Sequence, residues 1–201
     1  MSEENRAEAM AHRVERACLR ARFDAAGVAL VVTAYRLAIA RRTLAFPDPQ
    51  HPEFLHPGRT ALILLEDLGA RDPVLPAAAA VCDTLRPELG LPLEQVEAAL
   101  GPEARRLAQA VPAPASAGDR LAELLVSADG PVRLIALSER LDHARHLHLG
   151  ESAGWHGWHR ETCELYLPVA ERTHPTLARR YRWWCRMFRR RFLDAQPVTG
   201  S

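Results

Sequence analysis

Two apolar segments joined by a short turn constrain the fold most. Residues 58–68 and 74–85 both have helical character, and the turn 69–73 separates them. Asp72 is suited to cap the second helix, because its side chain can accept hydrogen bonds from the first free N–H groups. Pro73 is favoured at a first helical position, and Arg86-Pro87 ends the segment. The stretch 56–86 therefore predicts a helix pair around which the chain is organised.

The rest of the chain shows helical segments separated by proline and glycine. Residues 3–26 are rich in Ala, Arg and Glu, which predicts a helix ending near Gly27. Residues 28–44 place apolar side chains at helical spacing, and the proline-broken stretch 46–54 cannot continue that helix. Further helices are expected at 93–100, 102–111, 121–126, 131–147, 158–171 and 174–194. No segment alternates as a strand would, so the predicted class is all-α, with one domain over 1–201.

Composition excludes several functional classes. The chain carries 26 basic and 25 acidic residues, so its net charge gives no argument for nucleic acid. The longest apolar run, 27–35, is too short to span a bilayer, and the polar N-terminus does not resemble a signal peptide. The four cysteines form no paired motif, which is typical of a reducing compartment. We expect a cytoplasmic protein without a nucleic-acid or membrane partner.

Several motifs occur in a fixed order between residues 34 and 172. His56-Pro57 opens a helix, PAAAAVCDTL forms the next one, and LIALSERLDHARHL and ETCELYLPVAER follow. In order and spacing these motifs resemble the HD-type phosphohydrolases of the branch that hydrolyses (p)ppGpp. The resemblance implies a single HD-domain-like helical bundle. The helices at 3–26 and 174–194 would flank it.

The resemblance also implies a divalent metal, manganese or zinc, held by side chains from several helices. Such a metal polarises a phosphoryl oxygen and lowers the pKa of a bound water. The ligands that carry over are His56, Asp83 and Glu139. Cys82 stands in place of a histidine and can bind zinc as a thiolate. His143 lies one turn after Glu139, so a relocated site of His56, Glu139 and His143 is an alternative.

Other positions depart from the family pattern. The first metal histidine falls on Arg41 or Arg42, and an arginine brings a positive charge that it cannot lose. The catalytic acidic pair falls near Arg86 and Pro87, so no catalytic residue is assigned. We therefore predict a catalytically impaired member, a pseudoenzyme with no metal. An active metal-dependent phosphohydrolase with an altered ligand set is the alternative.

Arginines are expected to gather near the former metal site. They are Arg41, Arg42, Arg59, Arg86 and Arg140. Guanidinium groups recognise phosphate bidentately, so a metal-free pocket that binds a nucleotide, a guanine nucleotide above all, is one interpretation. In the other interpretation these arginines form salt bridges that fill the pocket, and the protein acts through its surface on a partner protein. The carboxylates available for such bridges are Glu66, Asp67, Asp83 and Glu139.

Three helical features outside the motifs also carry expectations. The helix 131–147 is expected to bury its first half and expose its polar second half to solvent. In the last helix an apolar stripe predicts a core contact; it consists of Leu177, Tyr181, Trp184, Phe188 and Phe192. Trp183 and Met187 lie off the stripe and could form a homo-oligomer interface.

A histidine-rich patch follows the helix 131–147. It contains His146, His148, His156 and His159, with Trp155 and Trp158 among them. No neighbouring cysteine or acid in the sequence completes a zinc site with His156 and His159. The patch is therefore interpreted as a loop entering the next helix, with tryptophans packed on the core beside exposed histidines.

Overall fold

The computed structural model describes residues 3–46, 48 and 50–194, and this part of the chain contains helices and turns but no strand. The predicted all-α class is confirmed. The helices are α1 (Glu3–Arg20), α2 (Ala25–Ala45), α3 (His56–Leu62), α4 (Val74–Cys82), α5 (Leu93–Leu100), α6 (Pro102–Ala110), α7 (Pro114–Ala117), α8 (Leu121–Ser127), α9 (Gly130–His146), α10 (Trp155–Glu161), α11 (Leu167–Thr173) and α12 (Pro175–Phe188). Wider π-helical turns occur at Ile63–Asp67, Thr162–Tyr166 and Arg189–Leu193, and a 3₁₀ turn at Asp83–Leu85.

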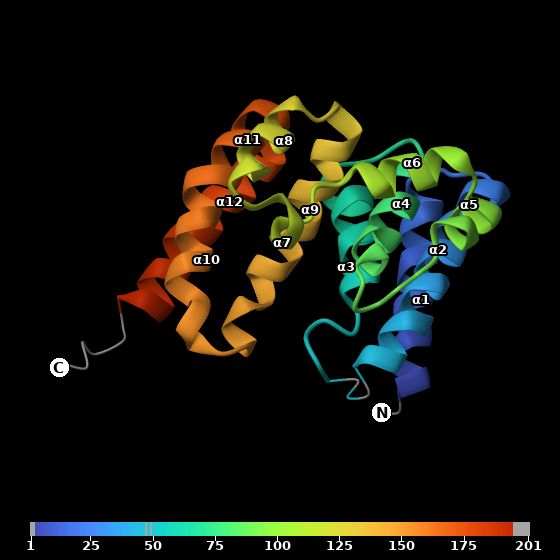
Figure 1. Ribbon diagram of the computed structural model, residues 1–201. Helices are drawn as coiled ribbons and strands as arrows, with labels where there is room; N and C mark the ends of the chain where they lie inside the picture. Colours follow the sequence, from blue (N-terminus) through green and yellow to red (C-terminus); the bar gives the residue numbers. More distant parts are fainter. Residues whose placement is uncertain (1–2, 47, 49, 195–201) are drawn as a thin grey trace.

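Two groups of helices lie on either side of α9, as Figure 1 shows. The first group, α1 to α6, encloses the largest apolar core, to which α9 contributes Val132 and Ile135. In the second group α8, α11 and α12 enclose another core, together with Leu137 and Leu141 of α9. A third, smaller core lies under α10 and includes Ala144 of α9. One helix therefore connects all three cores.

The burial of α9 corrects the expectation that its second half is solvated. Every residue from Ile135 to Asp142 is buried, including Glu139, Arg140 and Asp142. The helix has no solvent-facing stripe over this stretch, because protein covers it from both sides. Its charged side chains must therefore find partners inside the protein.

The predicted boundary between the first two helices was wrong. The first helix ends at Arg20, and the second begins at Ala25, so Gly27 lies inside the second helix. Asp24 sets this boundary, because its carboxylate accepts a hydrogen bond of 2.8 Å from the Gly27 N–H. Between the helices Arg22 has a left-handed backbone, with φ of 64°. The predicted elements at 93–100, 102–111 and 131–147 agree with the observed ones to within one residue.

The C-terminal part also differs from expectation at one point. The glycine-broken segment before residue 158 is not all loop, since α10 already begins at Trp155. Pro168 does not end this helical stretch, because it lies at the start of α11, directly after a π-helical turn. The predicted apolar stripe is confirmed as core: its four members in α12 are buried, and Phe192, in the π-helical turn that follows, is half-buried.

No helix in the described ranges combines the length and apolar character needed to cross a membrane. The predicted proline-broken connection at 46–54 is non-helical where it is described, and Pro47 and Pro49 lie outside the described residues. Residues 1–2 and 195–201 of the predicted domain lie outside them as well.

Gly58 permits the close packing of α3 against α1 and α2, and Gly58→Ala tests it. A Cβ at this position would lie 2.5 Å from Met10 Cγ and 3.0 Å from Tyr35 Cε2. We expect the variant to lower the free energy of unfolding by about 1–3 kcal/mol, as overpacking does. Chemical denaturation measures this. Gly157→Ala is the control, because nothing lies within 4 Å of its Cβ position. Equal effects of the two substitutions would contradict the packing argument.

Candidate functional site

Charged side chains meet where the two groups of helices face one another. Arg42 comes from the end of α2, Asp83 and Arg86 from the end of α4, and the others from α9 and from the connection before α3. We refer to the whole set as the central ring. Its members are Arg42, Glu53, Asp83, Arg86, Glu139 and His143.

Arg42 and Asp83 form the most deeply buried pair of the ring. The Arg42 side chain is 1% exposed and that of Asp83 is 5% exposed, and Arg42 Nη2 pairs with Asp83 Oδ2. Arg42 Nη1 donates a hydrogen bond of 2.7 Å to the Glu53 backbone carbonyl. Burial lowers the pKa of Arg42 to about 10, so the guanidinium stays charged at neutral pH. Two buried opposite charges in contact stabilise each other, and loss of either one would leave the other uncompensated.

The other four members of the ring form a chain of contacts that runs from Asp83 back to Arg42. Arg86 lies 2.6 Å from Asp83 through Nε and 2.6 Å from Glu139 Oε1 through Nη2. His143 then lies 3.6 Å from Glu139 Oε1 and 3.0 Å from Glu53 Oε1. Glu53 returns to Arg42, with 3.5 Å between Oε2 and Nη1. The six side chains thus form a closed ring in which positive and negative charges alternate.

The protonation of His143 balances the ring. Burial alone would lower the pKa of His143, but the carboxylates of Glu139 and Glu53 outweigh burial and raise it to about 9. Burial would raise the pKa of Glu139, but His143 and Arg86 outweigh it and lower that pKa to about 2. At neutral pH the ring therefore carries three positive and three negative charges.

These residues do not fit the divalent metal that the resemblance implies. Donor atoms of Asp83, Glu139 and His143 do lie within 4.8 Å of one another. However, guanidinium groups already contact both oxygens of Asp83, and Arg42 cannot become a neutral ligand. A dication would add two positive charges to a buried ring that is already balanced, which costs several kcal/mol.

His56 belongs to a second set of contacts beside the ring. Its Nδ1 lies 2.8 Å from Asp142 Oδ2, and Arg59 Nε donates to the same carboxylate at 2.8 Å. Burial and the positive charge of His143 together lower the pKa of His56 to about 4, although the hydrogen bond with Asp142 acts in the opposite direction. The neutral imidazole of His56 stacks on the His143 ring, with 4.1 Å between the ring centroids. His56 therefore contacts the central ring by stacking its imidazole on that of His143, and its own carboxylate partner, Asp142, is not a member of the ring.

Arg140 points from α9 towards the second group of helices. Its guanidinium carbon lies 3.2 Å from the centre of the Trp158 ring and 4.6 Å from that of Tyr166. Its Nη2 lies 3.1 Å from Glu161 Oε2, and Nε donates to Thr162 Oγ1 at 3.2 Å. Guanidinium groups favour such aromatic faces. The contacts tie α10 to α9 at the rim of the ring.

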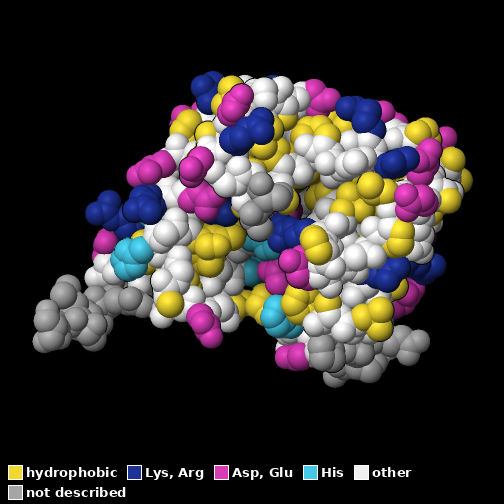
Figure 2. All heavy atoms as spheres, viewed as in Figure 1, with side chains coloured by type: hydrophobic (Ala, Val, Ile, Leu, Met, Phe, Trp, Pro, Cys, Tyr) yellow, Lys and Arg dark blue, Asp and Glu magenta, His cyan; other side chains and the backbone are white. Residues whose placement is uncertain are grey.

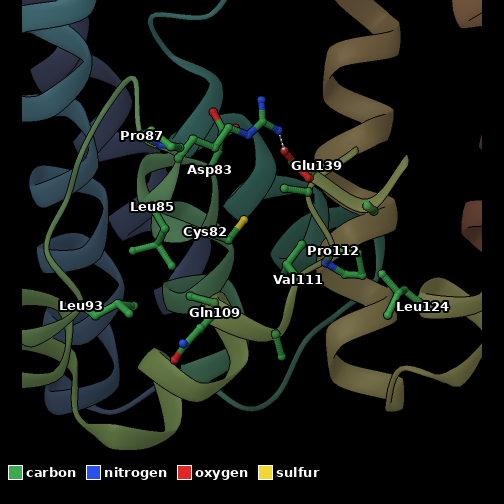
Figure 3. Close-up of a pocket in the computed structure, with 15 residues that line it drawn as sticks. Cys82, Asp83, Leu85, Pro87, Leu93, Gln109, Val111, Pro112, Leu124 and Glu139 are labelled. Carbon is green, nitrogen blue, oxygen red and sulfur yellow. Dashed lines mark hydrogen bonds and ion pairs between the residues drawn. The ribbon is translucent and has the colours of Figure 1, made fainter. Parts of the chain in front are cut away.

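Two cavities meet at the Arg86–Glu139 pair. One has a volume of about 810 Å³, and it contains the whole ring in its wall together with Phe46, Trp158 and Tyr166. Figure 2 shows acidic, basic and histidine side chains together in the hollow between the two groups of helices. The other cavity, of about 580 Å³, is mainly apolar. In Figure 3 Cys82 points into this second cavity, and the dashed line marks the contact of Glu139 with Arg86.

The structure brings most of the residues predicted for the site together, though not in one set. Of the two arginines predicted for the first-histidine position, Arg42 belongs to the ring, whereas Arg41 lies 3.4 Å from Gln95 Oε1. Arg59 forms a salt bridge with Asp142 rather than with a member of the ring. His56 and Asp83 do not share a group of donor atoms, and the Cys82 thiol donates to a backbone carbonyl within its helix.

The observed salt bridges bear on the two interpretations of the arginines. Asp83 and Glu139 pair with the predicted arginines, as the salt-bridge interpretation expects. Glu66 pairs instead with Arg13 and Arg20, and Asp67 pairs with Arg145 and Arg180. The salt-bridge set is therefore smaller than predicted and is concentrated around Arg42, Asp83, Arg86 and Glu139.

Sequence reasoning missed Glu53, Asp142 and Trp158. Glu53 lies three residues before His56, and this spacing was a usable signal once His56 was suspected. Asp142 lies three residues after Glu139, on an adjacent face of the same helix. Trp158 has no sequence signal of its own, because its partner Arg140 is on another helix.

No family model matches the sequence, and a search of curated proteins finds no match. Among solved structures, the fold is similar to that of a metazoan SpoT ortholog described as hydrolysing ppGpp and acting in starvation responses. The TM-score is 0.60 and the identity 20%, over 80% of this chain and 96% of that one. At this identity the likeness establishes the fold. It confirms the predicted resemblance to the HD-type (p)ppGpp hydrolases at that level.

The protonated His143 makes the stability of the protein depend on pH. Its pKa is raised to about 9 in the folded state, so its contribution is complete below its unfolded pKa near 6.5 and is lost as the pH rises through 9. We expect the free energy of unfolding to fall by about 2–3 kcal/mol between pH 6.5 and 9.5. Denaturation at several pH values measures this. His143→Gln should remove the alkaline loss, whereas the exposed His12→Gln should keep it. An unchanged slope in His143→Gln would contradict the assignment.

Proposed function

We propose that this chain is an HD-type pseudoenzyme that binds a guanine nucleotide in its central cavity without hydrolysing it by the metal-dependent route. The observation that carries the proposal is the Arg42–Asp83 pair at the former metal position. The likeness in fold to a ppGpp hydrolase supports the choice of ligand class. The residues of the ring supply the argument against hydrolysis.

Hydrolysis in the manner of HD enzymes needs an agent that lowers the pKa of water and a group that accepts its proton. Arg42 supplies positive charge but cannot bind water as a metal does. The carboxylates of the ring, Glu53, Asp83 and Glu139, are each paired with a cation, and the pKa of Glu139 is lowered to about 2 by His143 and Arg86 against the effect of burial. Such weakly basic groups are poor proton acceptors at neutral pH. The ring therefore favours binding over water activation.

Nucleotide binding is supported by the size and lining of the cavity. A volume of about 810 Å³ falls in the range of small-molecule sites. Phe46 and Trp158 offer aromatic surface for a base, and Arg86 offers a guanidinium for phosphate. Arg86 is the ring arginine that can respond to a ligand, since 36% of its side chain is exposed against 1% for Arg42. A phosphate can replace Glu139 on Arg86, while Arg42 still neutralises Asp83.

Binding can be tested by thermal denaturation with ppGpp, GTP and GDP in the presence of EDTA. We expect at least one of these to raise the melting temperature, because a ligand selective for the folded state adds about 2.7 kcal/mol at 100 times its Kd. Arg86→Gln should lower the affinity for that ligand by about tenfold or more, since it removes a charge-assisted hydrogen bond. Arg36→Gln is the matched control, because this exposed arginine pairs with Glu8 away from the cavity. No stabilisation by any of the nucleotides would favour a filled pocket and a surface role towards a partner protein.

The catalytic half of the proposal has its own test. The protein incubated with Mn²⁺ and ppGpp should release no pyrophosphate, and Mn²⁺ should not bind in a manner that depends on Asp83. Manganese bound at one per chain and lost in Asp83→Ala would overturn the pseudoenzyme proposal. That result would leave the nucleotide-binding measurement intact.

A metal-dependent phosphohydrolase with a relocated metal is the second candidate. Donor atoms of Glu53, His56 and His143 lie within 4.8 Å of one another, which favours it. His143 would have to lose its proton, and a pKa raised to about 9 by the neighbouring carboxylates opposes this at neutral pH. Pyrophosphate release that requires Mn²⁺ and disappears in Glu53→Gln would establish this candidate in place of the first.

Two further proposals concern the setting of the protein. We infer a reducing cytoplasmic location, which the free thiols of Cys18, Cys82, Cys163 and Cys185 support. We also propose that a homo-oligomer, if it forms, uses α12. Trp183 on that helix is 54% exposed, although it is a large apolar side chain.

A further inference from the structure

A second set of possible ligands lies among the C-terminal helices, away from the central ring. His159 is in α10, Cys163 is in the π-helical turn that follows, and Cys185 is in α12. One donor atom from each of the three lies within 4.8 Å of the others. Sequence spacing does not indicate this grouping, because Cys185 is far from the other two along the chain. The histidine-rich patch therefore does have cysteine neighbours, contrary to the sequence interpretation.

The local fold directs these side chains to one point. His159 and Cys163 are one helical turn apart, and the wider π-helical turn Thr162–Tyr166 shifts Cys163 relative to a regular helix. The His159 ring lies against Trp184 and Phe188 of α12, with 5.7 Å and 6.2 Å between ring centroids. Its Nε2–H donates a hydrogen bond of 2.9 Å to the Cys185 backbone carbonyl, which leaves the Nδ1 lone pair free to bind a metal. These contacts hold the imidazole between the two helices and close to both cysteines.

The separations are close to those in a tetrahedral zinc site. Bonds of about 2.3 Å to sulfur and about 2.0 Å to nitrogen place the two ligands about 3.5 Å apart at a tetrahedral angle. The observed separation of Cys163 Sγ from His159 Nδ1, the ring nitrogen that is free to bind, is 3.9 Å. One donor atom from each of the three side chains lies within 4.8 Å of the others, so all three can reach one ion.

We propose that His159, Cys163 and Cys185 form a binding site for a thiophilic divalent metal, Zn²⁺ above all. Binding releases the two thiol protons to solvent, and the resulting thiolates neutralise the charge of the ion. No oxidation or reduction takes place. The three protein ligands leave a fourth position, which water fills. A cavity of about 430 Å³ lies beside His159.

Charge distinguishes this site from the central ring. The charged side chains of the adjoining cavity, Arg189 and Asp194, lie 3.4 Å apart and balance each other. Arg160 also lines this cavity, and its side chain is exposed to solvent. Among the described residues, no guanidinium forms a salt bridge with the two thiols, in contrast to the carboxylates of the central ring. A bound metal would connect α10 to α12, and α10 also carries Trp158 and Glu161 of the central cavity.

Cobalt titration of the reduced full-length protein tests the proposal. We expect one Co²⁺ per chain, with thiolate-to-cobalt charge-transfer absorption and visible bands of tetrahedral coordination, and displacement of the cobalt by one equivalent of Zn²⁺. Cys163 is half-buried. The Cys163→Ser variant should show no charge-transfer absorption, or half of it, and should bind Co²⁺ at least about tenfold more weakly. His159→Gln should weaken binding to a similar extent. Circular dichroism of each variant shows whether it remains folded.

Cys18→Ser is the matched control, because Cys18 is a buried thiol remote from this set and should leave the spectrum unchanged. Absence of thiolate-to-cobalt absorption in the folded, reduced protein would overturn the proposal. Absorption that survives in Cys163→Ser at full intensity would overturn it as well. Because Asp83→Ala leaves these three residues intact, a metal lost on that substitution reports on the central ring and a metal lost in Cys163→Ser reports on this site.

Discussion

The buried contact between Arg42 and Asp83 determines much of the surrounding structure. Neither charge can be removed alone, because an uncompensated buried ion costs about 3–5 kcal/mol. Asp83 also contacts Arg86, which requires a further carboxylate, and Glu139 supplies it. His143 and Glu53 then complete the alternation of charges. The ring is therefore best understood as one electrostatic unit, and the buried charge of Arg42 is stable because its neighbours are arranged around it.

The central helix α9 connects these compensated charges to the rest of the fold. It packs into all three apolar cores and presents Glu139, Arg140 and Asp142 to different partners. Displacement of Glu139 from Arg86 would leave the Arg86 guanidinium without this carboxylate, while His143 stays 3.6 Å from Glu139 Oε1. A ligand that takes this place on Arg86 must therefore supply negative charge. For the proposed nucleotide, a phosphate group meets this constraint.

The sequence predicted the scaffold better than the site, for physical reasons. Helices such as 93–100 follow from local propensity and flanking prolines, which act over a few residues. The ordered motifs identified the fold, and they placed an arginine at the first-histidine position. The contacts around that arginine could not be predicted fully, because those of Glu53 with His143 and of Asp142 with His56 join segments far apart in the chain. The first helix boundary was missed because Asp24, rather than Gly27, controls it.

The two groups of possible metal ligands illustrate why residue types alone do not identify a metal site. Both place at least three donor atoms within 4.8 Å of one another. In the central ring the carboxylates already face arginines, so a dication has to compete with permanent charges that cannot leave. At Cys163 and Cys185 the competing cations are protons, which leave readily when a metal stabilises the thiolates. Since the protein can release protons but not guanidinium groups, the cysteine-containing group is the one that can accept a metal without loss of existing ion pairs.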